Sequence, residues 1–267
     1  MSLLPRIVPV LTFRDRLLVK PVKFGQEKYI GDPVNAVRIF NEKQVDEIVF
    51  VDLSASERPG NVDLDFLEEM ASEAFMPVGY GGGVNSAEIA RSITALGVEK
   101  VILNSAFAEH GGLISKISSE IGSQSTVVSI DTRKKRFGGY ESYQRRGTQA
   151  LHRNPVDLAV EAAAQGAGEL ILHSIDREST FHGFDLKLIS EVSQRVNVPI
   201  IALGGARGLE DFSKAIAAGA SAAAAGSAFV LQGKHRAVLI TYPTQTDIRL
   251  SLSSLTDGEK LEVSSRN

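Results

Sequence analysis

Four short turns rich in glycine and other small residues are the clearest candidates for chemistry in this sequence. Each turn follows a short apolar run. The four turns are Gly81-Gly82-Gly83, Asn104-Ser105, Gly204-Gly205 and Gly226-Ser227. Small residues at the start of a helix let backbone N–H groups approach an anion closely. One such turn alone is more often only a tight turn, but the second pair of turns repeats the first at an offset of 122 residues. We therefore expect two anion sites and a ligand with two phosphates or equivalent groups.

Four charged residues each open an apolar run, at the end opposite the glycine turns. They are Arg6, Glu47, Lys100 and Glu169. Charged side chains that point inward would be costly to bury unless they are paired. Two cations and two anions could instead close into a neutral ring. Each residue taken alone is more commonly one that points to solvent, so both interpretations stay open.

Other polar residues lie on the same side as the glycine turns. Asp52 and Asp176 end apolar runs and could bind a substrate or simply form a polar rim. His173 could be an acid–base group or a structural histidine, and Lys20 could close over an anion or remain solvated. The five histidines show no metal-ligand spacing. We therefore expect no metal and no cofactor.

Short runs rich in Val and Ile alternate with longer segments of helical periodicity. Strands are predicted at 6–12, 47–53, 76–81, 100–104, 126–131, 169–175, 198–203 and 221–226. Helices are predicted near 33–43, 63–74, 86–96, 109–120, 155–165, 185–195, 209–218 and 233–239. Near-continuous apolar strands indicate burial on both faces, as in parallel sheets. Eight such alternating units predict an α/β fold, a (β/α)₈ TIM barrel.

The repeat decides between this barrel and a doubly wound open sheet. The two copies keep one register from the pair Pro33 and Pro155 to the pair Phe107 and Phe229. Two copies of four β/α units favour closure, because eight-fold geometry divides evenly into halves. We expect a single domain over 1–242 with half-barrels at about 1–122 and 123–242.

Three long segments interrupt the alternation, at 13–31, 132–150 and 176–183. Each follows a strand, so in a barrel all three lie on the rim that carries the active site. The segment 243–267 loses helical regularity. It is expected to be a peripheral tail with a disordered end.

Composition excludes several classes of protein. A chain of 267 residues with 43% hydrophobic content can bury a sizeable core. A net charge of -3 gives no support for nucleic-acid or anionic-membrane binding. No cysteine is present, which excludes disulfides and a thiol nucleophile. Without a signal peptide or an apolar run of ~18 residues, the chain is expected to be a cytoplasmic globular protein.

Over roughly residues 5–240 the sequence resembles the cyclase subunit of imidazole glycerol phosphate synthase, the HisF family. The matching stretches are 6–9, 31–33, 46–52, 81–83, 100–105, 122–124, 166–169 and 204–206. The resemblance implies a barrel that takes ammonia from a glutaminase, a HisH-like subunit docked at its bottom. It also implies that the ammonia is used on a small bisphosphorylated ribulosyl carboxamide. Arg6, Glu47, Lys100 and Glu169 would then form the gate at which ammonia enters.

The catalytic pair of that family is incomplete in this chain. The family has aspartates at the ends of the first and fifth strands, which serve as general acid and base. Asp131 matches the second aspartate, whereas the first position is Thr12. A threonine does not titrate near neutral pH, so it cannot replace that group. A positioned acid–base group is worth ~10²–10⁴ in rate, so we expect cyclase chemistry to be badly impaired.

The segments 13–16, 19–24, 29–33 and 233–240 resemble one branch of the family, the sugar-amidation-associated, WbuZ-like barrels, which lack the first aspartate. This resemblance implies a barrel that relays ammonia from a glutaminase towards a sugar amidotransferase of a surface-polysaccharide pathway. Two classes of function follow. The favoured one is a conduit and scaffold with little chemistry of its own. The alternative is a genuine cyclase, a lyase of histidine biosynthesis.

Overall fold

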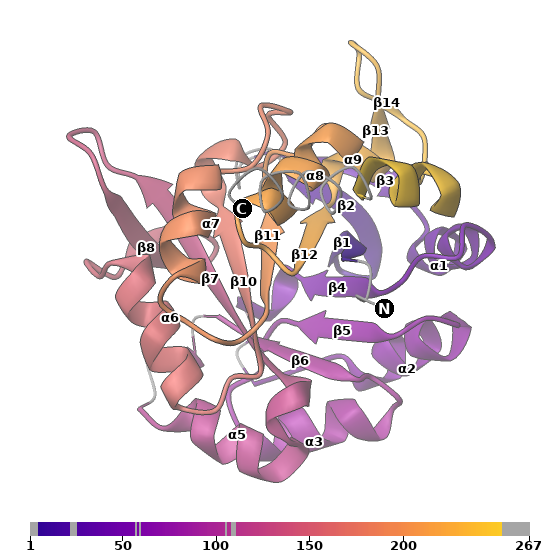
Figure 1. The fold of residues 1–267 in the computed structure, drawn as a ribbon. Helices are drawn as coiled ribbons and strands as arrows, with labels where there is room; N and C mark the ends of the chain where they lie inside the picture. Colours follow the sequence, from indigo (N-terminus) through magenta and orange to yellow (C-terminus); the bar gives the residue numbers. More distant parts are fainter. Residues whose placement is uncertain are drawn as a thin grey trace, which may run out of the picture.

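The computed structural model describes residues 5–21, 26–56, 58, 60–104, 106–107 and 111–252. Eight parallel strands form its centre (Figure 1). They are β1 (Arg6–Arg14), β4 (Ile48–Asp52), β5 (Val78–Gly81), β6 (Lys100–Leu103), β7 (Thr126–Lys134), β10 (Glu169–Ser174), β11 (Ile200–Leu203) and β12 (Ala222–Ala225). Each strand is hydrogen-bonded to the next, and β12 pairs with β1. The sheet is therefore closed, which confirms the predicted TIM barrel and excludes the open sheet.

Helices follow the strands and surround the barrel (Figure 1). They are α1 (Pro33–Glu42), α2 (Leu64–Glu73), α3 (Ala87–Ala95), α5 (Leu113–Ile121), α6 (Pro155–Ala164), α7 (Leu186–Ser193), α8 (Leu209–Ala217) and α9 (Ser227–Val230). The repeat is visible in how helices begin. Asp32 caps α1 ahead of Pro33, and Asn154 caps α6 ahead of Pro155. A capping side chain and a proline at the first helical position both favour initiation there.

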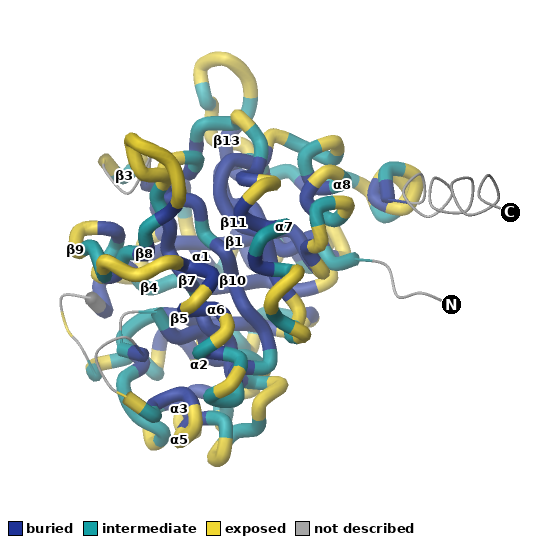
Figure 2. Tube along the Cα trace, turned by 60° about the vertical axis from the view of Figure 1, so that its left-hand side comes forward, coloured by how far each residue is buried: buried dark blue, intermediate teal, exposed yellow. Residues whose placement is uncertain are grey.

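The core has two layers, and successive residues of each strand contribute to both. Ile7 packs in the outer layer between strands and helices, whereas Val8 packs in the inner layer along the barrel axis. This alternation follows from the two-residue period of a strand. Figure 2 shows the buried strands at the centre and the exposed segments around them. The inner layer is apolar, with Val49, Val127 and Ile201 among its members.

Two of the segments predicted as loops contain additional strands. In 13–31, β2 (Leu17–Pro21) and β3 (Glu27–Gly31) form an antiparallel extension of β1. In 132–150, β8 (Tyr140–Gln144) and β9 (Gln149–Ala150) extend β7 in the same way. Short 3₁₀ turns lie elsewhere, at η1 (Ser54–Ser56), η2 (Ser123–Ser125) and η3 (Ile175–Arg177).

The helix predicted at 233–239 is wrong. This segment is a hairpin in which β13 (Leu231–Gln232) pairs with β14 (Ala237–Val238). Its turn contains Gly233 at φ 71° and Arg236 at φ 50°, which are left-handed conformations that a helix does not contain. The helix predicted from 109 begins at Leu113, and residues 108–110 lie outside the described part of the chain.

The segment after Pro243 is helical over 245–252, so the predicted loss of helical regularity is wrong there. Thr244 Oγ1 accepts the Asp247 N–H at 3.2 Å, and Asp247 Oδ2 accepts the Thr244 N–H at 3.3 Å. This reciprocal cap starts the helix. Ile248 and Leu252, four residues apart on one face, are buried against the core. Residues 253–267 lie outside the described chain.

No helix among the described residues combines the length and the apolar character needed to cross a membrane.

Candidate functional site

A cavity of about 300 Å³ opens at the carboxyl ends of the barrel strands. Its wall contains both positions of the expected catalytic pair, Thr12 and Asp131. The other predicted site residues that line it are Lys20, Asp52, Gly82, Gly83 and Asn104. Seven of the predicted site residues therefore lie around one cavity at the carboxyl end of the barrel.

Thr12 and Asp131 are related by the internal repeat. In the sheet, Thr12 is aligned with Val51 and Asp131 with His173. Val51 and His173 are themselves repeat partners, 122 residues apart. The two residues thus occupy the same position in the two half-barrels. Thr12 is buried, and its hydroxyl donates a hydrogen bond to the carbonyl of Val19 on β2.

A chain of four ionisable side chains runs through the wall of the cavity. Asp131 Oδ1 lies 3.2 Å from His173 Nδ1, and His173 Nε2 lies 3.1 Å from Glu178 Oε2. The other oxygen of Glu178 lies 2.6 Å from the Lys20 ammonium. The Lys20 and Glu178 side chains are each only 5% exposed. We call these four residues the mouth quartet.

Two members of the quartet, His173 and Glu178, are held in their charged forms by their neighbours. Burial alone would lower the pKa of His173, but its contacts with Asp131 and Glu178 raise that pKa to about 9. Burial would likewise raise the pKa of Glu178, yet the Lys20 and His173 charges hold it far below its usual range. The result is two cations and two anions in alternation. His173 uses both ring nitrogens in these contacts, so it cannot pass a proton to a ligand without breaking one of them.

The two predicted anion positions differ in their surroundings. Gly82 and Gly83 are half-buried and line the cavity, with φ of 139° and 67°. A Cβ on Gly82 would lie 2.8 Å from the Asp52 carbonyl oxygen, so only glycine fits there. Asn104 lies beside them and donates from Nδ2 to the Ser129 carbonyl at 3.0 Å. Ser105 lies outside the described residues.

The second set of residues predicted to bind an anion does not line the cavity. Gly204, Gly205, Gly226 and Ser227 are all buried, and none is among the residues that line it. The Ser227 hydroxyl lies 2.5 Å from that of Ser179.

The two aspartates predicted to lie at the rim, Asp52 and Asp176, differ in their location. Asp52 lines the cavity, where burial raises the pKa of its carboxyl group. Its Oδ1 accepts the Ser54 N–H at 2.8 Å. Asp176 does not line the cavity, and its Oδ2 accepts the Lys134 N–H at 2.9 Å. Asp176 therefore joins the loop after β10 to the end of β7.

Two arginines that were not predicted as site residues from the sequence also line the cavity. Arg145 and Arg146 occupy the turn between β8 and β9, at φ of 50° and 58°. Arg146 Nη2 lies 2.9 Å from Glu27 Oε1, and Glu27 also pairs with Arg14 at 2.7 Å. The only signal for them was a basic pair inside a long loop. Within the described residues, no group of three or more His, Asp or Glu side chains is arranged to hold a metal ion.

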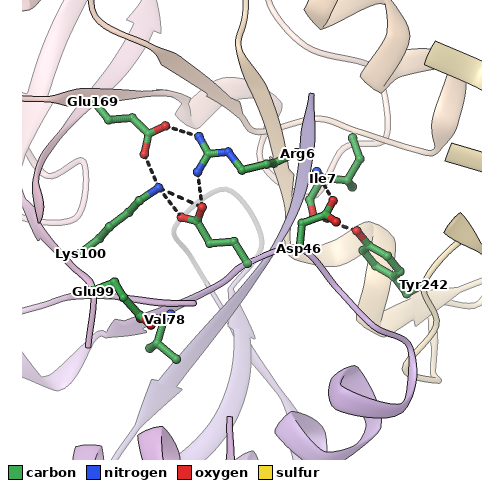
Figure 3. Close-up of polar contacts among 9 residues, drawn as sticks. Arg6, Ile7, Asp46, Val78, Glu99, Lys100, Glu169 and Tyr242 are labelled. Carbon is green, nitrogen blue, oxygen red and sulfur yellow. Dashed lines mark hydrogen bonds and ion pairs between the residues drawn. The ribbon is translucent and has the colours of Figure 1, made fainter. Parts of the chain in front are cut away.

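At the opposite end of the barrel, the four charged residues that open strands or precede them form a closed ring (Figure 3). Lys100 Nζ lies 2.9 Å from both Glu47 oxygens and 2.7 Å from Glu169 Oε2. Arg6 pairs with the same two glutamates. Burial would lower the pKa of Arg6, but the two carboxylates raise it. We call this set the floor ring; its geometry corresponds to the paired ring, one of the two interpretations that the sequence left open.

The floor ring is supported by a second layer of contacts (Figure 3). Asp46 Oδ2 accepts the Ile7 N–H at 3.4 Å, and the Tyr242 hydroxyl donates to the Ile7 carbonyl at 2.8 Å. These contacts fix the start of β1 and with it the position of Arg6. Tyr242 therefore braces the barrel floor.

Comparison with known proteins agrees with this architecture. The sequence profile described as "Histidine biosynthesis protein" matches residues 6–236. A Pseudomonas aeruginosa protein provisionally named imidazole glycerol phosphate synthase subunit hisF2 is 46% identical over 242 residues, which is 89% of this chain and 95% of that protein. A similarly named HisF protein of Leptospira borgpetersenii is 44% identical over 91% of this chain and 96% of its own length. The imidazole glycerol phosphate synthase subunit HisF of Alkaliphilus metalliredigens is 39% identical over 84% of this chain and 89% of its own length.

Proposed function

The chain belongs to the histidine biosynthesis protein family and is a HisF-type synthase subunit, and from that premise we propose that it relays ammonia and binds a phosphorylated ligand without closing an imidazole ring. The proposal rests on a difference between the two ends of the barrel. The floor ring is complete, whereas the mouth has Thr12 in place of one acid–base group and pairs the other, Asp131, with a cation. A general acid and a general base must each be able to exchange a proton with the ligand.

Ammonia enters through the floor ring from a glutaminase docked on the amino-terminal face of the barrel. Glu47 and Glu169 are 2% and 4% exposed, so their charges are sustained by Arg6 and Lys100. Ions buried this deeply add little net stability, and a functional reason for keeping them is therefore needed. Beyond the ring, the inner layer consists of apolar side chains such as Val8, Val127 and Ile201, which suits the passage of ammonia, a small neutral molecule.

The phosphorylated ligand binds at the mouth, beside Gly82, Gly83 and Asn104. Arg145 and Arg146 add positive charge to the same cavity, which favours an anion there. The hydroxyl of Thr12 is committed to the Val19 carbonyl. The ligand is accordingly held and positioned rather than converted by the usual acid–base pair.

The ammonia serves the amidation of a surface-polysaccharide sugar, through a sugar amidotransferase that acts after the barrel. This assignment rests on the absence of the first aspartate and on the resemblance of the rim segments to the sugar-amidation branch. A cyclase of histidine biosynthesis is the second candidate. The presence of Asp131 and of the Gly82-Gly83 turn at the mouth favours that candidate.

Complementation separates the two functions. A histidine auxotroph that lacks its cyclase but retains its glutaminase should not grow on minimal medium when this chain is supplied. The same strain supplied with an authentic cyclase is the positive control, and immunodetection confirms that both proteins accumulate. Growth supported by this chain would refute the conduit proposal. Co-purification with a candidate HisH-like glutaminase, produced in the same cells, tests the partner directly, and failure to associate would also refute the proposal.

A further inference from the structure

We propose that the mouth accepts a ligand with a single phosphate-like group, held beside Gly82 and Gly83, because the repeat-related second position is filled by the protein's own side chains. This inference rests on the proposed function, since it specifies the chemical class of the ligand bound at the same mouth. It departs from the sequence-based expectation of two anion sites, and it depends on a difference between the two half-barrels.

The first observation is a difference in exposure between repeat partners. Gly82 and Gly83 are half-buried and form part of the cavity wall. Their partners Gly204 and Gly205 are buried and lie outside the cavity lining. A Cβ on Gly205 would lie 2.2 Å from the Gly183 carbonyl oxygen, so the loop before α7 lies directly against this turn. An anion has access to the first turn and not to the second.

Lys20 fills the position next to Gly226. A Cβ built on Gly226 would lie 2.4 Å from the Lys20 ammonium nitrogen, so this ammonium lies against the Gly226 backbone. The charge of Lys20 is already matched by Glu178 at 2.6 Å. A cation that could have bound a phosphate is thereby paired inside the protein.

Glu178 adds a repulsive charge at the same place. Its repeat partner in the first half is Ser56, a neutral residue. The carboxylate is held ionised by Lys20 and His173, with its pKa far below the usual range. Like charges a few ångströms apart in a buried site strongly disfavour each other. A second phosphate would therefore meet a fixed negative charge as well as an occupied space.

Ser179 covers the hydroxyl group of Ser227. Its Oγ lies 2.5 Å from Ser227 Oγ and donates to the Pro21 carbonyl at 3.0 Å. One small side chain thus ties the end of β2, the loop after η3 and the start of α9 together. Ser227 is 4% exposed as a result.

The other residues that line the cavity indicate the chemistry of the part of the ligand that lies away from the phosphate. The same cavity wall carries apolar side chains, among them Val51, Ile171 and Leu203. Apolar walls with few convergent polar groups suit an uncharged moiety. The ligand class is therefore a phosphate monoester with an uncharged part that lies against these apolar side chains.

Calorimetric titration with two sugar phosphates tests this inference on the full-length protein. Ribulose 5-phosphate and ribulose 1,5-bisphosphate differ by one phosphate. We expect both to bind with dissociation constants within about threefold of each other, and inorganic phosphate to bind at one per chain. A bisphosphate that binds more than about thirtyfold tighter, or two phosphates per chain, would overturn the inference while leaving the proposed anion binding intact. No binding of any of the three would overturn both.

Substitutions in the two half-barrels test which of them holds the phosphate-like group. Asn104→Ala should weaken both sugar phosphates by about tenfold, because a hydrogen-bonding group next to a charged ligand is lost. Ser227→Ala, in the second half, should change neither dissociation constant by more than about twofold.

The double variant Lys20→Ala with Glu178→Ala removes one cation and one anion together, so His173 keeps Asp131 as its partner. In that variant we expect the bisphosphate to become at least about fivefold tighter than the monophosphate, and equal affinities would count against the blocking role. If the double variant does not fold, the comparison of Asn104→Ala with Ser227→Ala still decides the matter.

Discussion

His173 and Asp131 lie side by side on β10 and β7, in register, with Nδ1 of the imidazole 3.2 Å from Oδ1 of the carboxylate. The same imidazole contacts Glu178 through its other nitrogen. Asp131 is the repeat partner of Thr12, so one member of the expected acid–base pair is neutral and the other is engaged in an ion pair. The mouth of this barrel is thus organised around a structural charge network.

The first prediction concerns the pH dependence of stability through His173. Its pKa is about 9 in the folded protein, against ~6.5 in an unfolded chain. The folded state therefore binds the proton more tightly. The stabilisation is complete below pH ~6.5 and is lost as pH rises through about 9. A shift of this size corresponds to a contribution on the order of 3 kcal/mol.

Urea unfolding of wild type and His173→Gln at pH 6 and pH 10 measures this contribution. The difference between the two proteins should be large at pH 6 and small at pH 10. His152→Gln, at a histidine whose side chain is 84% exposed, serves as the control and should change little at either pH. A difference that is constant or larger at high pH would contradict the charged state of His173.

The second prediction concerns the missing aspartate. Thr12→Asp should raise ammonia-dependent cyclase turnover from its low level, with ~10²–10⁴ as the upper limit for one acid–base group. The gain should be smaller than this limit, because a carboxylate cannot donate to the Val19 carbonyl and Asp131 remains paired with His173. Adding His173→Ser should increase the gain by releasing Asp131.

Steady-state turnover with saturating ammonium chloride is the measurement, and Thr12→Ser, which keeps the hydroxyl, is the control. Strong cyclase turnover by the wild-type protein would show that Thr12 is not disabling, and our preferred function would then be wrong.

The third prediction concerns the stability of the floor ring. Glu47 contacts both Arg6 and Lys100 and is 2% exposed. Glu47→Ala leaves two cations without one of their partners and should lower the free energy of unfolding by about 3–5 kcal/mol. Glu73→Ala removes the partner of the exposed Arg38 and should have a far smaller effect. Equal effects in chemical denaturation would contradict the buried, interdependent character of the ring.

The barrel itself was predictable because its signals are local. Strand and helix periodicity acts over short stretches of sequence, and the repeat can be read by comparing the two halves of the chain. The floor ring was also predictable, because its four residues occupy equivalent positions where strands begin. The helix predicted at 233–239 failed because Gly233 and Arg236 favour a turn that the apolar pattern alone does not reveal.

The mouth quartet could not be predicted in the same way. Lys20, Asp131 and Glu178 come from three different β/α segments, and only closure of the barrel brings them to one wall. The glycine pattern correctly indicated a turn at Gly204-Gly205. It carried no information about the side chains that cover this turn, so the sequence suggested two equivalent positions where the structure gives the two turns different surroundings.

The last prediction concerns passage of ammonia through the floor ring. Lys100 Nζ bridges Glu47 and Glu169 and closes one side of the ring, with its side chain 17% exposed. If ammonia passes here, Lys100→Ala should let it escape, because the two carboxylates lose one of the two cations that hold them together. With the glutaminase bound and an amidation acceptor present, we expect glutamine consumed per product formed to rise several-fold. Binding of phosphate at the mouth should stay within about twofold, since the two sites lie at opposite ends of the barrel.

The measurement compares glutamate released with amidated product in the purified complex. Lys214→Ala, at a lysine on α8 that is 52% exposed, is the matched control and should leave the ratio unchanged. Ammonium chloride supplied in bulk should restore product formation in Lys100→Ala, because it bypasses the passage through the ring. If wild type uses bulk ammonia as efficiently as glutamine, or if Lys100→Ala leaves the ratio at the wild-type value, ammonia does not travel through the floor ring and its charges serve structure alone.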